Sequence, residues 1–276
     1  MEKHELEQAM KLNYLVKTYQ GINKLVVATK LRLNSINPDA DSKADPVLGG
    51  EDGNKGLESA KGVCSRNIEK CLKEHPIWTE WAVNVPGCGP AIAGTLLVLW
   101  KWKSLPICND CGGLLEKNGG MFCLDCGKEA KGDGVLSYRI EQRDFPNISK
   151  WWAYLGRHCS EEGRMPKRRK GEVANWSTVG RTITYQLGEC FVKSSALSNP
   201  YRAYYDSRKI YREKTHPEAS KGHRHNMAKN ETVKLFLGHW WQVARTLEGK
   251  PLTDPYPIQI QGHSGVIAPY FWLKAE

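Results

Sequence analysis

Four of the nine cysteines occur as two C-x-x-C pairs, a spacing that is typical of a metal site. Cys108 and Cys111 form the first pair and Cys123 and Cys126 the second, with eleven residues between the pairs. Four thiolates at this spacing suit tetrahedral Zn²⁺, and a site with four protein ligands and no open position is structural. The residues between the pairs predict a β-hairpin with an Asn-Gly turn at 118–119. We therefore expect a zinc ribbon over residues 104–134, with Zn²⁺ as its structural cofactor.

A glycine-rich turn lies just before the strongly apolar residues 91–100 and consists of Pro86, Gly87, Cys88 and Gly89. Pro90 follows, and proline is well tolerated in the first turn of a helix, so a helix is expected to begin there. Glycines let a partner's backbone approach closely, and a helix N-terminus offers unpaired N–H groups to an anion. If the apolar residues 77–85 form the entering helix, the pattern is a helix-hairpin-helix that binds DNA phosphates. The alternative is an ordinary turn between two packed helices.

A basic segment between residues 156 and 181 contains lysines and arginines that could neutralise several phosphates at once. They are Arg164, Lys167, Arg168, Arg169, Lys170 and Arg181. Four consecutive cations between glycines cannot be buried, and Ser177 and Thr178 after them are candidate N-caps of a helix. We expect this segment to contact DNA; a solvated loop is the alternative.

The overall composition favours a polyanionic partner. The 276 residues carry a formal net charge of +10, which indicates nucleic acid first and an anionic membrane second. No segment has eighteen consecutive apolar residues, and residues 1–5 show no signal-peptide pattern, so we expect no membrane span and no secretion. An odd number of cysteines, four of them in metal-type spacing, indicates a reducing compartment. We expect a cytoplasmic protein.

Hydrophobic periodicity predicts a mainly α protein: a helical domain containing the helix-hairpin-helix, an inserted small β zinc ribbon, and a long N-terminal helix. That amphipathic helix, over residues 5–34, is of the kind that pairs with a helix of the same chain or of a second copy, so a homo-oligomer is open. Further helices are expected over 57–73, 148–155, 178–195, 199–214 and 224–247.

We expect six regions along the chain. They are a coiled-coil-like helix (1–36), a linker (37–60), helices with the helix-hairpin-helix (61–103), the zinc ribbon (104–134), a helical DNA-binding region (135–250) and an extended proline-rich tail (251–276).

Together these segments resemble a family of insertion-sequence transposases. In that family a RuvC-like DEDD nuclease domain is joined, through a coiled coil, to a helix-hairpin-helix domain that has a nucleophilic serine. The resemblance covers most of residues 10–245. It depends on the coiled-coil-like residues 19–36, His75-Pro76, the hairpin 85–93, the segment ISKWWAYLG at 148–156, and residues 177–186, 201–205 and 227–241.

The resemblance implies DNA recombination, and it places the nucleophile in the loop after Tyr154-Leu155-Gly156. Ser160 is the first candidate there and Ser177 the second. Two features depart from the family. The residues before the coiled-coil-like helix are too few for a RuvC-like domain, so we expect no counterpart of its metal-binding carboxylates, and the zinc ribbon is an insertion.

Three functions stay open at this point. The first is a DNA-binding protein of transposase type that contacts the DNA backbone with little base readout. The second is an active serine-dependent DNA strand transferase, in which Ser160 forms a transient link to DNA. The third is an RNA-binding zinc-ribbon protein, and a guide or structured RNA is also an open partner of the first two.

Overall fold

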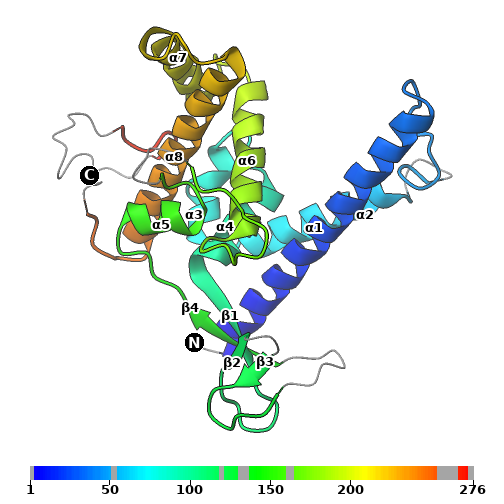
Figure 1. Cartoon of the computed structure of the whole chain (residues 1–276), viewed down its shortest axis with the longest axis vertical. Coiled ribbons are helices and arrows are strands. Elements are labelled where there is room, and N and C mark those ends of the chain that lie inside the picture. Colours follow the sequence, from blue (N-terminus) through cyan, green and yellow to red (C-terminus); the bar gives the residue numbers. More distant parts are fainter. Residues whose placement is uncertain are drawn as a thin grey trace.

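A computed structural model of the chain describes residues 3–50, 55–117, 121–129, 137–159, 165–253 and 267–272. Its most extended part is a helical hairpin of α1 (Lys3–Ile36) and α2 (Leu57–Leu72), which projects from the body (Figure 1). The two helices are antiparallel, since Lys30 forms an ion pair with Glu58 at one end and Gln8 bonds Glu74 at the other. The long N-terminal helix is confirmed, and it packs on a helix of its own chain. No helix in the described ranges combines the length and low polarity needed to cross a membrane.

The body is a group of helices whose starts follow the capping rules. They are α3 (Pro76–Thr79), η1 (Ala82–Asn84), α4 (Pro90–Lys101), α5 (Ile148–Tyr154), α6 (Thr178–Lys193), α7 (Pro200–Thr215) and α8 (Lys221–Leu247). Proline occupies the first turn of α3, α4 and α7. The N-cap side chains that accept a backbone N–H are Asn147, Ser177, Asn199 and Ser220. The predicted mainly helical fold is thus confirmed.

The segment before the glycine-rich turn differs from the prediction of one entering helix. It consists of the single turn α3 and the 3₁₀ turn η1, with a break at Trp81. Trp81 adopts φ −141° and ψ −64°, which a helix does not contain. This break directs the indole into the core, where Trp81 is fully buried.

The structure contains two small antiparallel sheets. One connects the cysteine-rich region to the body, and the other is part of that region. β1 (Trp102–Ile107) pairs with β4 (Ser137–Gln142) and connects the body to the outlying β2 (Leu115–Lys117) and β3 (Met121–Cys123), as Figure 1 shows. The sequence predicted the β2–β3 hairpin but not the β1–β4 ladder. The predicted Asn-Gly turn at 118–119 lies outside the described residues.

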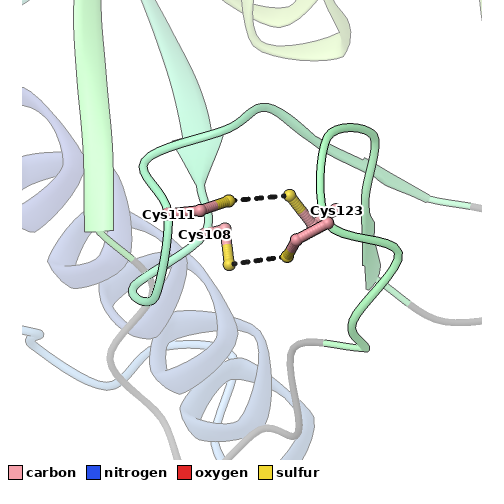
Figure 2. A group of neighbouring side chains, drawn as sticks. Cys108, Cys111 and Cys123 are labelled. Carbon is pink, nitrogen blue, oxygen red and sulfur yellow. Dashed lines mark hydrogen bonds between the residues drawn. The ribbon is translucent and has the colours of Figure 1, made fainter.

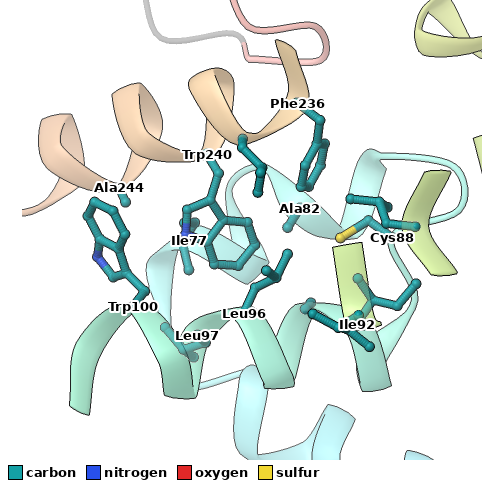
Figure 3. Packing of buried hydrophobic residues seen from close by; sticks show 14 of the residues in the cluster. Ile77, Ala82, Cys88, Ile92, Leu96, Leu97, Trp100, Phe236, Trp240 and Ala244 are labelled. Carbon is teal, nitrogen blue, oxygen red and sulfur yellow. The ribbon is translucent and has the colours of Figure 1, made fainter. Parts of the chain in front are cut away.

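An aromatic core joins α3, η1, α4 and α8 (Figure 3). The ring of Trp81 stacks on Phe236 at a centroid distance of 5.4 Å and meets Trp240 edge-on at 6.1 Å. Its indole N–H donates to the carbonyl oxygen of Tyr270 at 2.7 Å. The C-terminal residues 267–272 therefore cover this core.

His239, on α8, ties the same C-terminal residues to α7. One ring nitrogen, Nε2, lies 2.9 Å from the carbonyl oxygen of Ile267, and Nδ1 lies 2.7 Å from the hydroxyl of Tyr201. A carbonyl only accepts, so Nε2 carries the proton and Nδ1 accepts from the hydroxyl. Burial lowers the pKa of His239 to about 4. The histidine is thus held neutral in the folded protein.

We expect the free energy of unfolding to fall as the pH is lowered from about 6.5 to about 4. In this range the unfolded chain protonates the histidine at position 239 and the folded chain does not, so acid favours unfolding. The difference between pKa values of 6.5 and about 4 corresponds to about 3 kcal/mol. Urea unfolding at pH 7.5 and pH 4.5 measures it, and His239→Gln should lose less stability over the same interval. An equal loss in the variant would contradict the assignment.

Candidate metal centre and candidate nucleic-acid interface

The two C-x-x-C pairs lie in turns of the same construction. Gly112 donates its N–H to the carbonyl of Cys108 at 2.9 Å, and Gly127 donates to that of Cys123 at 3.0 Å. Both glycines have positive φ, 73° and 70°, a backbone region that favours glycine. Each pair of thiols is therefore presented by a short, fixed turn.

The four sulfur atoms converge between these turns (Figure 2). Cys108 Sγ lies 3.9 Å from Cys126 Sγ, Cys111 Sγ lies 3.4 Å from Cys123 Sγ, and all four atoms lie within 4.8 Å of one another. Sulfurs bound at about 2.3 Å around a tetrahedral ion are about 3.8 Å apart. A disulfide needs about 2.05 Å, and these cysteines are free thiols. The predicted residues thus form a cluster that is compatible with a metal ion.

Backbone N–H groups favour the thiolate form of Cys123, whereas the neighbouring sulfurs of Cys123 and Cys126 raise the pKa of Cys111. The pKa of Cys123 is lowered to about 7, first because the N–H of Cys126 donates to its sulfur and then because that of Asp125 does so. An ion pair of 2.8 Å between Lys128 and Asp110 joins the two turns. The sequence analysis did not single out Gly113, where an added Cβ would lie 2.4 Å from an oxygen of Asp125. The feature of the sequence that could have indicated Gly113 is its position as the second glycine of C-x-x-C-G-G.

Part of the glycine-rich turn packs against the body of the protein. Gly87 has φ +90°, and an added Cβ would lie 3.1 Å from the Cβ of Cys190 on α6. The side chain of Cys88 is buried in the core, and burial raises the pKa of its thiol. The carbonyl of Pro86 accepts a hydrogen bond of 3.1 Å from the Asn199 side chain. The side chain of Cys88 therefore supports the fold, although the sequence analysis placed this residue among the DNA contacts.

The backbone of the same turn keeps free donors at the surface. The amides of Gly87, Gly89 and Ala91 have no acceptor among the residues that the structure describes. Both glycines are exposed, and a Cβ added to Gly89 would meet open space. Free N–H groups at the start of a helix of this length form an anion site. The start of α4 therefore has free donors where the sequence predicted a phosphate contact for Gly87 and Gly89, and that contact stays a prediction.

Replacing Gly87 by alanine should lower the free energy of unfolding by about 2 kcal/mol. The turn would hold the alanine at a positive φ, which is strained for a residue with a Cβ, and this Cβ would press against Cys190. Gly89→Ser is the matched control and should be nearly neutral, because serine is a good N-cap and has space there. Denaturant unfolding of both variants measures the effect; equal losses would show that the close approach at residue 87 is not needed.

The basic segment forms an exposed loop before α6. Its four consecutive cations, Lys167 to Lys170, are all exposed, and the loop curls around a cavity of about 280 Å³. Within the described part of the chain, the ion pair found for them joins Arg169 to Glu172 at 3.7 Å. Most of their charge is therefore available to a partner.

The other predicted residues of this segment have different positions. Arg181 is half-buried: its guanidinium lies 5.7 Å from the Trp176 ring and donates to the carbonyl of Pro166, so it supports the loop. The hydroxyl of Ser177 accepts the N–H of Gly180 at 3.0 Å and caps α6. Ser160 and Arg164 lie outside the described residues.

Arg157 adds a buried positive charge between α6 and α8, which the sequence did not indicate. Its side chain is 6% exposed and donates to Thr184 Oγ1 at 2.9 Å and Asn230 Oδ1 at 3.2 Å. Burial, and then the charge of Arg181, lower its pKa to about 10, so it stays charged at neutral pH. The one feature of the sequence that could have indicated Arg157 is its position directly after Gly156.

The two predicted DNA-contacting elements lie toward opposite ends of α6. The basic loop leads into its first turn, whereas the glycine-rich turn packs on Cys190 near its last turn. Ten residues of helix between Gly180 and Cys190 span about 15 Å. The two elements are therefore separate in the structure and do not form one combined site.

No family model, no curated protein and no solved structure matches the chain. The resemblance to insertion-sequence transposases therefore depends on short motifs. The function has to follow from the chemistry of the cysteine cluster, the glycine-rich turn and the basic loop.

Proposed function

We propose that this is a DNA-binding protein of transposase type, which contacts the phosphate backbone and carries structural Zn²⁺ in its cysteine cluster. The observation that carries the proposal is the basic loop, where four consecutive exposed cations have one carboxylate partner among the described residues. Cations placed in this way neutralise phosphates and release counterions. Four thiolates with no open position suit Zn²⁺ in a structural role.

The spacing along α6 supports contact with a nucleic-acid strand at two points. The free amides at Gly87 and Gly89 and the basic loop are separated by about 15 Å of helix. Phosphates follow one another by about 3.4 Å along the axis of a duplex, so the two elements can contact the same backbone a few nucleotides apart. Contacts of this kind position a protein on DNA and read little sequence.

The experiment is a comparison of affinities over a range of salt concentrations. Fluorescence anisotropy with a 30-base-pair duplex and a structured RNA of the same length, from 50 to 400 mM salt, is sufficient. We expect tighter binding to the duplex and a fall of log K with log salt with a slope of about −4 or steeper. Weak binding that is independent of salt would overturn the proposal, and tighter binding to RNA would favour an RNA-binding protein.

A further inference from the structure

The cavity inside the basic loop has aromatic and apolar walls, which binding of a phosphate does not require. It measures about 280 Å³, and its lining combines aromatic, apolar, amide and cationic side chains with one carboxylate, that of Glu172, which pairs with Arg169 at 3.7 Å. Apolar side chains come from the half-buried Pro166 and Ala174, whereas Val173 lies at the rim and is 97% exposed. Phosphates of a duplex lie on a convex surface and require cations, whereas a concave apolar wall suits the flat face of a base.

The aromatic part of the wall is fixed by packing. The rings of His158 and Trp176 meet edge-on, with centroids 6.4 Å apart and an angle of 66°. Gly156 has φ +66°, and an added Cβ would lie 2.6 Å from Cδ1 of Trp176, so the indole rests directly on this backbone. The wall therefore keeps its shape when a ligand enters, which reduces the entropic cost of binding.

Polar groups at the cavity are not used by the fold. The exposed amide of Asn175 makes no hydrogen bond to another described residue, whereas Nδ1 of His158 is buried and is not accessible from the cavity. The side chains of Lys167, Arg168 and Arg169 also line the cavity and reach solvent. The cavity thus combines one free amide for a base edge with cations for the adjoining phosphates.

We propose that this cavity receives one unpaired nucleotide of the bound DNA. Its base packs on the aromatic and apolar wall, the amide of Asn175 bonds the base edge, and the cations at the rim contact its phosphates. The volume is slightly below the usual range of ligand pockets, which suits a single nucleotide. The inference rests on the proposed DNA binding and deepens it by naming the structure that is preferred.

The test compares a fully paired duplex with the same duplex carrying one bulged 2-aminopurine. We expect about tenfold tighter binding of the bulged DNA, since stacking of one base on an aromatic side chain contributes 1–3 kcal/mol. Quenching of the 2-aminopurine fluorescence should accompany binding. Ala174→Trp, which fills the cavity, should remove the preference and the quenching while the affinity for the paired duplex stays within twofold.

Two further variants keep the test decisive. Ala203→Trp makes the same change at an exposed position of α7 and should keep the preference. Asn175→Ala alters an exposed side chain without disturbing the fold and should reduce the preference severalfold. Paired and bulged DNA bound equally by the wild type, or an equal loss for both in Ala174→Trp, would overturn the inference and leave DNA binding intact. A wild type that binds neither would overturn the proposed function itself.

Discussion

Replacing Cys123 by serine is expected to abolish metal binding: the purified protein should contain one Zn²⁺ per chain and the variant none. Cys123 is buried, and its sulfur receives two backbone N–H groups, so this thiolate is among the best-prepared ligands of the cluster. Structural zinc sites contribute about 10–16 kcal/mol of apparent binding free energy with a full set of four ligands, and a serine hydroxyl is a poor replacement for a thiolate. Elemental analysis of the purified proteins measures the metal and its identity.

The same variant should unfold the ribbon and leave the body folded. The hydrophobic cluster of the ribbon consists of Cys108, Leu115 and Cys123 with Met121 against it, which is too small to be stable without a metal. The main core lies elsewhere and includes none of these residues. Hydrogen exchange should therefore rise in residues 107–129 and remain unchanged in α4 and α8.

A cysteine outside the cluster supplies the control. Cys64→Ser, on α2, should keep one metal ion per chain and normal exchange in the ribbon. Unchanged metal content in the variant at position 123 would contradict the assignment. A wild-type protein that contains no metal after purification and does not take up Zn²⁺ would contradict it as well.

The features that the sequence predicted correctly depend on neighbouring residues. The C-x-x-C turns need only their own glycines, and α6 and α7 begin where Ser177 and Asn199 cap them. The β1–β4 ladder could not be found in this way. It pairs Trp102 with Gln142 across the whole ribbon; Ser137 to Glu141 alternate polar and apolar residues, but β1 does not, and nothing near either strand indicates its partner.

The features of the candidate site that the sequence did not predict also depend on long-range contacts. The break at Trp81 follows from the packing of its indole on Phe236 and Trp240, which are more than 150 residues away in the chain. The position of Gly87 against Cys190 is also a long-range contact, and it places the turn and the basic loop toward opposite ends of α6. Local sequence patterns predict the glycine-rich turn and the basic loop, but they do not predict the distance between the two.

Removing the four cations of the loop should weaken binding of duplex DNA about a thousandfold at 0.1 M salt. The variant replaces Lys167, Arg168, Arg169 and Lys170 by alanine. Each phosphate contact contributes about 0.9 to the slope of log K against log salt, so four contacts contribute about 3.6, which is between three and four orders of magnitude at 0.1 M. All four side chains are exposed, so the stability of the fold should change little. Anisotropy titrations at several salt concentrations give both the affinity and the slope.

The matched control separates a contact from a general effect of charge. A second variant removes the same four charges from exposed positions of α1, by alanine at Lys11, Lys17, Lys24 and Arg32. Both variants lower the net charge from +10 to +6, so long-range attraction falls by a similar amount in each. Direct phosphate contacts are lost only from the loop variant, which alone should show the large fall in slope. Equal losses in the two variants would mean that the loop contributes charge but is not the place where DNA binds.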